Sequence, residues 1–322
     1  MKLGVLTVPL YDRSFEDALK WLAERGVHTL EVGNGGFPGN THINPDDYLG
    51  FPESIMTLKS LLSKYDMTIA ALSCHGNCVH PDKAVAKKFQ DDFEKTVLMA
   101  EQLGVDTIVT FSGCPGGSPE DKTPNWVTCS WPEDFAKILD YQWNEVLIPY
   151  WKEAVKFANA HGVKKIALEM HPGFCVYNTT SLLRLREAVG PTIGANFDPS
   201  HLIWQGMEPC EAVRVLGGEA IHHVHAKDTY LDQANIKKAG VLSTGHYSDV
   251  LNRAWTFRTV GYGLDVKAWK DFVSMLRMVG YDGVLSIEHE DMFMSVEEGL
   301  EKAITFLKDI MPVEPMGEMW WA

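Results

Sequence analysis

Residues 165–173 read Lys-Ile-Ala-Leu-Glu-Met-His-Pro-Gly, an apolar run that ends in a carboxylate, Glu169, and an imidazole, His171. Apolar side chains within a strand predict that the strand is buried, so polar groups at its end indicate a site at the strand ends. Later runs also close on an acid, a His or both, at residues 193–201, 221–228 and 284–291. The four runs therefore predict buried strands whose ends meet at one polar site.

A second pattern repeats between these runs: a helix end, a glycine, a short polar turn and a new strand. It occurs around Gly26, Gly104, Gly162 and Gly280. Glycine commonly follows the last turn of a helix because it adopts the left-handed conformation without steric cost. Helices and strands are therefore expected to alternate along the whole chain.

We predict eight strands, each followed by a helical pattern. They lie near residues 2–8, 28–33, 67–73, 105–111, 164–169, 192–198, 221–226 and 284–288. Eight such units without a break in composition favour an α/β fold with a single closed (β/α)8 barrel, the TIM barrel, over residues 1–310. Residues 311–322 are expected to form a C-terminal tail. The alternative is a doubly wound open sheet, but its glycine-rich phosphate-binding turn is absent after the first strand.

Two connections that follow strands are unusually long, Ser112–Trp131 after the fourth strand and Asp228–Gly263 after the seventh. Both exceed the usual length of about two to six residues. Loops that follow barrel strands lie on the catalytic face, so both are expected to form lids or substrate walls. The alternative is that they cover surface or form a contact between subunits.

The composition excludes several classes of protein. The net charge is −14, from 29 basic and 43 acidic residues, which disfavours a nucleic-acid partner. Six cysteines without framework spacing suit reduced thiols in a cytoplasmic protein. No run reaches the roughly 18 apolar residues that a membrane span needs. We therefore expect a soluble, cytoplasmic protein with no membrane partner.

Glu169, Asp198, His225 and Glu288 each stand at the end of a different predicted strand. Closure of the barrel points all four side chains at one place. Three carboxylates and one imidazole suit Mn²⁺, Mg²⁺ or Co²⁺ better than a structural zinc site built from thiolates. The sequence thus predicts one divalent cation bound by these four residues.

The motifs around these four residues resemble those of the sugar phosphate isomerase/epimerase family, which has a xylose-isomerase-like barrel and includes ketose 3-epimerases and inosose dehydratases. They are Leu168–Gly173, Asn196–His201, His223–Asp228 and Ser286–Asp291. The resemblance covers nearly the whole chain. It implies that the four predicted ligands bind one divalent cation, commonly Mn²⁺, with Mg²⁺ and Co²⁺ as alternatives.

The resemblance also implies an isomerase or epimerase that acts on a keto sugar. A cation that chelates the carbonyl and a neighbouring hydroxyl lowers the cost of forming an enediolate, so that a carboxylate can remove the adjacent proton. Glu169 and Glu288 are the expected pair of catalytic carboxylates, one taking the proton and the other returning one. His171 is expected to be a further acid or base, or a group that supports the ligands.

Five other residues are expected to contact the carbohydrate substrate: His75, Trp126, His201, Lys227 and Arg258. His201 and Arg258 resemble substrate-binding residues of the family, although His201 has the alternative role of orienting Asp198. Lys227 is either a cation of the pocket or one half of a buried pair with its neighbour Asp228.

A different reaction at the same site is the main alternative. If the sugar carries a 3-keto group, proton removal at C2 expels the substituent at C1, which makes the protein a lyase or deglycosidase. C-glycoside deglycosidases of this type need a second, smaller subunit. We expect a homo-oligomer, or an assembly with such a subunit. The charge counts against the DNA-repair endonucleases that share the fold, and a non-catalytic sugar sensor would not need two opposed carboxylates.

Overall fold

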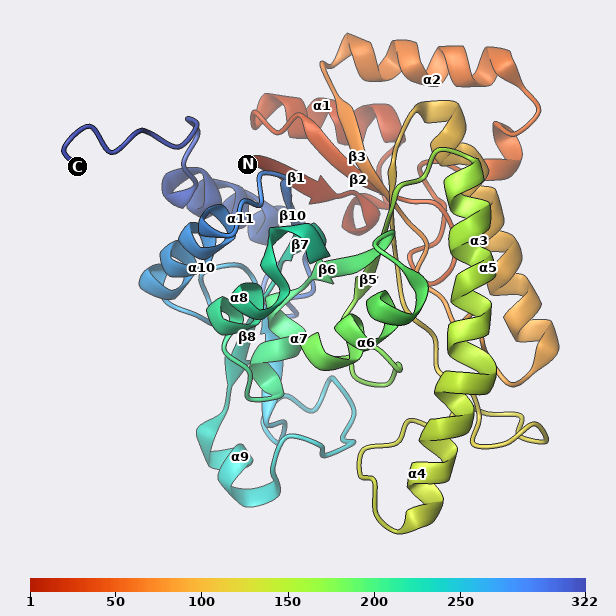
Figure 1. The fold of residues 1–322 in the computed structure, drawn as a ribbon. Coiled ribbons are helices and arrows are strands. Elements are labelled where there is room, and N and C mark those ends of the chain that lie inside the picture. Colours follow the sequence, from red (N-terminus) through yellow and green to blue (C-terminus); the bar gives the residue numbers. More distant parts are fainter.

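The computed structural model describes all of residues 1–322 and contains a closed barrel of eight parallel strands (Figure 1). Around the barrel the strand order is β1-β10-β7-β6-β5-β4-β3-β2. The strands are β1 Lys2–Leu6, β2 Thr29–Gly33, β3 Thr68–Ser73, β4 Thr107–Thr110, β5 Lys165–Glu169, β6 Ile193–Phe197, β7 Ile221–Ala226 and β10 Val284–Ile287. The predicted (β/α)8 barrel is confirmed, and the open sheet is excluded because β1 pairs with β10.

Helices connect the strands and surround the barrel. They are α1 Phe15–Glu24, α2 Pro52–Lys64, α3 Lys83–Leu103, α4 Glu133–Asp140, α5 Ile148–Ala160, α6 Thr179–Val189, α7 Pro199–Trp204, α8 Pro209–Ala220, α10 Val266–Met278 and α11 Val296–Ile310. Side chains cap the starts of several of them; the Ser14 hydroxyl, for example, accepts the backbone N–H of Asp17 at the start of α1. Gly104 ends α3 in the left-handed conformation, with φ 74°. Between β4 and β5 the chain is helical over most of its second half, where α4 and α5 are joined by a π-helical segment, Tyr141–Leu147.

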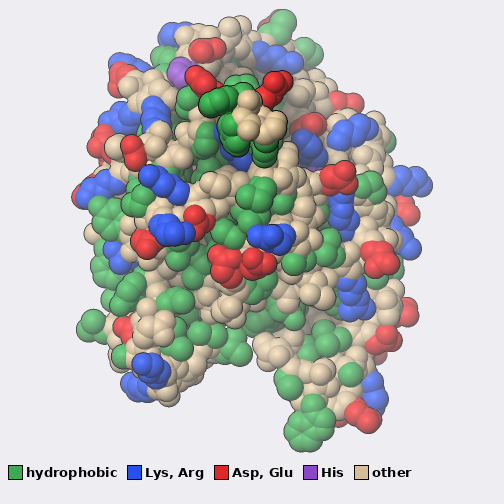
Figure 2. Space-filling view, turned by 60° about the vertical axis from the view of Figure 1, so that its left-hand side comes forward, with side chains coloured by type: hydrophobic (Ala, Val, Ile, Leu, Met, Phe, Trp, Pro, Cys, Tyr) green, Lys and Arg blue, Asp and Glu red, His purple; other side chains and the backbone are tan.

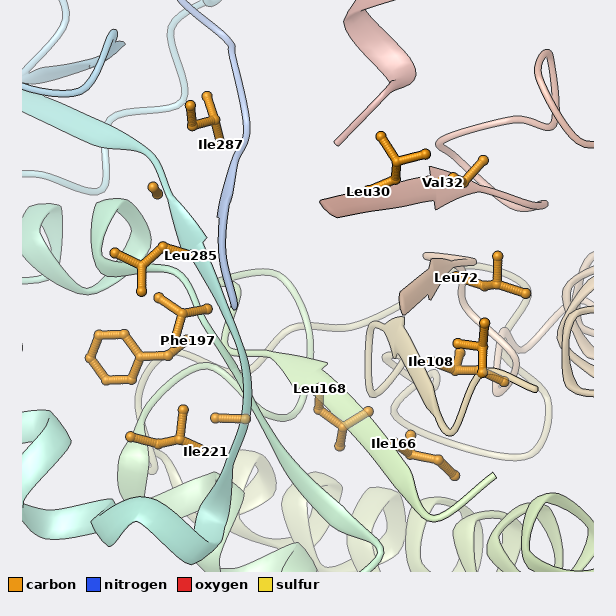
Figure 3. Close-up of a cluster of buried hydrophobic side chains, with 14 of the residues drawn as sticks. Leu30, Val32, Leu72, Ile108, Ile166, Leu168, Phe197, Ile221, Leu285 and Ile287 are labelled. Atoms are coloured by element: carbon orange, nitrogen blue, oxygen red, sulfur yellow. The ribbon is translucent and has the colours of Figure 1, made fainter. Parts of the chain in front are cut away.

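The alternation of side chains along each strand decides which groups enter the barrel. In β5, Ile166 and Leu168 belong to an apolar core of 63 buried residues, and Figure 3 shows such side chains pointing away from the ring of strands. Successive strand residues face opposite sides, so Ala167 and Glu169 face the interior. The core therefore fixes the register that turns Glu169 toward the barrel axis.

The connection after β7 has a structure of its own. A short strand, β8 Asp228–Leu231, pairs antiparallel with β9 Trp255–Arg258, and α9 Gln233–Ala239 lies between them. Trp255 stacks on Trp204 of α7 with ring centroids 4.5 Å apart, which ties this insertion to the barrel. The insertion with α9 and the segment with α4 extend from the same end of the barrel (Figure 1). The space-filling view in Figure 2 shows two lobes at the lower edge of the molecule with a notch between them.

The chain beyond α11 lies apart from the barrel. Met311 is buried, whereas Trp320 is 88% exposed and Trp321 is 68% exposed, and Figure 1 shows this segment leading away from the body. None of the helices has both the length and the apolar character that a bilayer-spanning helix requires. The expected homo-oligomer stays a prediction.

Candidate active site

The structure brings together the four predicted ligands from four neighbouring strands. Glu169 ends β5, Asp198 follows β6, His225 lies in β7, and Glu288 follows β10. One ligand atom from each lies within 4.8 Å of all the others. The first three residues are buried, and the side chain of Glu288 is 15% exposed. The cluster therefore opens to solvent on the side of Glu288.

Two buried atoms of this cluster, Asp198 Oδ2 and His225 Nδ1, make no contact with hydrogen-bond geometry. Asp198 Oδ2 lies 3.1 Å from Lys227 Nζ and 3.3 Å from His201 Nε2, which are ion-pair contacts only. His225 Nδ1 lies 3.0 Å from a Glu288 oxygen and 3.4 Å from a Glu169 oxygen without hydrogen-bond geometry. Buried polar atoms without partners are rare and need an explanation. A divalent cation would explain them, because three carboxylates and one imidazole nitrogen that point at one place form a suitable ligand set for such an ion.

Glu31 of β2 supports His225 from the opposite side. His225 Nε2 lies 2.9 and 3.0 Å from the two Glu31 oxygens. His223 Nε2 lies 3.0 Å from the same carboxylate, and the Ser73 hydroxyl also donates to it. Glu31 has no exposed surface. A carboxylate that binds one imidazole nitrogen fixes the ring so that the other nitrogen faces a metal.

Glu169 is held by side chains from three other strands or loops. One oxygen accepts from Asn196 Nδ2 at 3.1 Å and lies 2.9 Å from His75 Nε2. The other oxygen lies 3.0 Å from His201 Nε2. These contacts leave the orientation of the carboxylate little freedom, so its lone pairs are directed at the cluster and at the adjoining pocket.

Lys227 is the buried cation beside the cluster. Its Nζ lies 2.8 Å from Glu288, 3.1 Å from Asp198 and 3.1 Å from Glu290, and its side chain is only 2% exposed. Of the two sequence-based interpretations, the structure supports the pocket cation and not the pair with Asp228. Asp228 instead accepts hydrogen bonds from the indole of Trp269 and from backbone N–H groups of the insertion.

The protonation of the cluster follows from these contacts. Burial opposes the charged form of Glu169, but hydrogen bonds from His201 and His75 keep its pKa well below the usual value. Burial likewise opposes ionisation of Glu288, but Lys227 and then His225 lower its pKa to about 2. Both carboxylates are therefore ionised at neutral pH.

His171, beside the cluster, and His225, within it, differ in charge. Burial, together with the neighbouring His201, lowers the pKa of His171 to about 3, so His171 is neutral. Burial also opposes the charged form of His225, but Glu31 and Glu288 raise its pKa well above the usual value. In the absence of a cation, His225 is therefore protonated at neutral pH.

A pocket of about 210 Å³ opens directly above the cluster. Its walls include four of the residues predicted from the sequence, namely His75, His171, His201 and Lys227, together with the ligands Glu169 and Glu288. Phe111 forms one side, with its ring 4.6 Å from that of His75. A volume of this size suits a molecule of about monosaccharide size.

Two predicted substrate residues do not line this pocket. Arg258 pairs with Asp291, with Nε and Oδ2 3.3 Å apart, and its guanidinium lies 4.8 Å from the ring centroid of Phe293. Trp126 packs edge-on against Tyr177 at 5.6 Å and lines a separate pocket. Both residues lie on long connections, whose path the sequence pattern does not determine.

The sequence analysis assigned no role to Glu31, nor to Asn196, His223 and Glu290, which lie close to the predicted ligands in the sequence. The last three each stand two positions from a predicted ligand, namely Asp198, His225 and Glu288. Residues two apart on a strand face the same side, so this spacing could have identified Asn196 and His223. Glu290 follows the last strand, where the alternation no longer holds.

The barrel and the polar cluster at the ends of its strands define a TIM-barrel protein with a candidate metal centre. The family model of the xylose isomerase-like TIM barrel matches residues 19–310. The chain therefore belongs to this family, as the strand-end motifs predicted.

Two relatives align over almost the whole chain. The YfiH protein of Bacillus subtilis (strain 168), described as uncharacterized, is 44% identical over 310 residues, which cover 96% of this chain and 98% of the relative. The inosose dehydratase of Mesomycoplasma hyopneumoniae (strain J) is 24% identical, over 93% of this chain and 90% of the relative.

Solved structures show the same fold. The IOLI protein with a bound zinc atom has a TM-score of 0.66 at 19% identity, over 96% of this chain and 98% of that chain. A D-tagatose 3-epimerase-like protein has a TM-score of 0.63 at 22% identity, with the same coverage.

Proposed function

We propose that this protein is a divalent-metal-dependent isomerase or epimerase of a keto sugar. One observation carries the proposal: two ionised carboxylates, Glu169 and Glu288, belong to one candidate cation site and both face a pocket of about 210 Å³. The names of the similar proteins, an inosose dehydratase and a D-tagatose 3-epimerase-like protein, support chemistry on sugars or related cyclic polyols.

A bound cation would supply Lewis acidity, which acidifies the proton next to a coordinated carbonyl. Side chains of the protein would remove and return the proton and hold the substrate. Glu169, held by His75 and His201, is placed to take this proton. Glu288 is itself ionised, so it is placed to relay to the substrate a proton that it receives from the Lys227 ammonium group, 2.8 Å away. His201 and His75 are near enough to the pocket to hydrogen-bond the hydroxyls of the substrate.

Elimination next to the carbonyl is the second candidate reaction, and a dehydratase or a 3-keto-glycoside lyase would carry it out. A specific contact favours it. Lys227 Nζ lies 3.1 Å from Glu290, which is 49% exposed at the mouth of the pocket. An ammonium group beside a solvent-accessible carboxylate can deliver a proton to a departing oxygen.

We propose Mn²⁺ as the cation in cells. The ligand set also accepts other divalent ions, and the similar IOLI structure holds zinc. A direct test is the activity of the metal-free protein after addition of Mn²⁺, Mg²⁺, Co²⁺ or Zn²⁺, each at the same free concentration. Equal recovery with every ion would remove the case for Mn²⁺.

Proton NMR in D₂O tests the reaction. The Mn²⁺-incubated protein is mixed with a panel of ketoses, inososes and 3-keto-glycosides, the protein is removed, and the products are examined. Metal-dependent deuterium next to the carbonyl, with a new epimer or isomer, is the expected result. A released aglycone or an unsaturated product would identify the lyase instead. If EDTA or Glu288→Gln leaves the exchange unchanged, the site proposed here does not carry the reaction.

A further inference from the structure

A second pocket of about 300 Å³ adjoins the first. It shares two wall residues with the metal-site pocket, His171 and Glu290. The other side chains come mainly from the insertion after β7 and include Tyr247, Arg253 and Phe257. The two pockets therefore form adjacent compartments, and a ligand that passes between His171 and Glu290 would occupy both.

Phe257 links the two compartments. Its ring lies 4.6 Å from Lys227 Nζ and packs edge-on against the ring of His201 at 5.2 Å. Lys227 and His201 are walls of the metal-site pocket, whereas Phe257 is a wall of the second one. The second pocket consequently begins directly behind the groups proposed to contact the sugar.

Arg253 fixes the far wall of the second pocket. It is 8% exposed and donates to the backbone carbonyls of Trp255 at 3.2 Å and Gly245 at 2.7 Å. Its guanidinium lies 4.1 Å from the ring centroid of Tyr247 and 4.4 Å from that of Trp255. Tyr247 is thus held in place by stacking, although 57% of its surface is exposed.

The chemistry of the walls indicates the kind of group that fits. Val250, Met292, Phe257 and the ring of Tyr247 offer apolar and aromatic surface. Thr256 and Glu290 add polar atoms to the walls, but Arg253 already donates to two backbone carbonyls, so the walls do not match a second sugar ring, which needs a partner for each buried hydroxyl. A phosphate would meet the carboxylate of Glu290. A flat ring with few polar atoms is the group that these walls favour.

We propose that this second pocket binds an aromatic group attached to the keto sugar, so that the substrate is an aryl glycoside of a keto sugar rather than a free ketose. This inference rests on the proposed function, because the metal-site pocket must hold the sugar. His171 and Glu290 then flank the bond that joins the two parts of the substrate.

Calorimetric titration of the Mn²⁺-loaded full-length protein tests the proposal with two probes, phenyl and methyl β-D-glucopyranoside. We expect the phenyl glycoside to bind about tenfold more tightly, because only its ring reaches the aromatic walls. Tyr247→Ala should weaken phenyl glycoside binding by about 3- to 10-fold and leave methyl glycoside binding unchanged. Tyr247→Phe, which keeps the ring, should retain the preference.

Tyr230→Ala is the matched control, since Tyr230 lies in the same insertion, is 46% exposed and does not line the pocket. Equal affinities for the two glycosides, failure of the phenyl glycoside to bind, or equal losses for both in Tyr247→Ala would overturn the proposal. The proposed function fails separately: no keto sugar would then exchange deuterium, whereas the preference for the phenyl glycoside would persist.

Discussion

Replacement of Glu31 by Gln should weaken binding of the divalent cation, although Glu31 does not face the cation site. The carboxylate lies 2.9 Å from His225 Nε2, and Nδ1 of the same ring faces the cluster. When a cation occupies Nδ1, the ring proton is on Nε2 and is donated to Glu31. The amide of Gln keeps the size but loses the charge, and its NH₂ group can face a ring N–H.

The expected loss is about 10- to 100-fold in affinity, the usual effect of removing a carboxylate that orients a metal-binding histidine. This corresponds to about 1.4 to 2.7 kcal/mol. Titration of metal-free protein with Mn²⁺, followed by calorimetry, measures it. His223→Gln is the matched control, because His223 binds the same carboxylate but is not among the four ligands at the cation site. It should lose much less affinity.

The number of protons released on metal binding is a second, independent test of the contact between Glu31 and His225. Glu31 contributes most to the raised pKa of His225, so the metal-free protein carries a proton there that a cation must displace. Titrations in two buffers of different ionisation enthalpy should show about one proton released per ion at neutral pH in the wild type. Glu31→Gln should release less. Unchanged affinity and unchanged proton release in a folded Glu31→Gln protein would refute the role assigned to Glu31.

Three further predictions concern stability. Asp228→Asn should lower the free energy of unfolding, measured by urea denaturation, by about 3 kcal/mol, because the buried carboxylate accepts hydrogen bonds from Trp269 and several backbone N–H groups. Asp232→Asn, at the cap of α9, is the control, and an equal loss of stability in both variants would contradict this reasoning. Burial lowers the pKa of His222 from 6.5 to about 4, so the unfolded chain binds the extra proton and stability falls as the pH drops through this range. The fall should be about 1 to 2 kcal/mol between about pH 7 and 5, and His222→Gln should reduce it in urea titrations at each pH. Mn²⁺ at about 100 times its dissociation constant should add about 2.7 kcal/mol to the stability of the metal-free protein, seen as a higher Tm, whereas an unchanged Tm would mean that the folded state does not bind the ion.

The barrel could be predicted because its pattern is local. Each strand is an apolar run of a few residues, and a glycine such as Gly104 marks the end of the helix before it. The convergence of Glu169, Asp198, His225 and Glu288 could be predicted for the same reason, since each lies at or next to the end of its strand. Their role as metal ligands stays a prediction. Barrel closure then determines that the strand ends meet, whatever lies between them in the sequence.

The partners of the ligands were harder to predict because they depend on contacts across the barrel. Glu31 meets His225 only because β2 and β7 face each other over the interior, and nothing near either residue encodes the pairing. Lys227 shows the same difficulty. Its neighbour in sequence, Asp228, faces backbone groups of the insertion, while its actual partners come from other strand ends.

The insertion after β7 was predicted as a wall but not as a hairpin, because β8 and β9 are only four residues each and α9 separates them. Its fold matters for specificity. The barrel places the charged groups on rigid strands, where the geometry of proton transfer is fixed, whereas β9 places Phe257 against Lys227 and His201 from outside the barrel. Sequence changes in the insertion can therefore alter which group is bound beside the sugar without moving the ligands. We therefore expect the substrate choice of the proposed enzyme to depend on residues 228–263, whereas the barrel strands hold the candidate cation site.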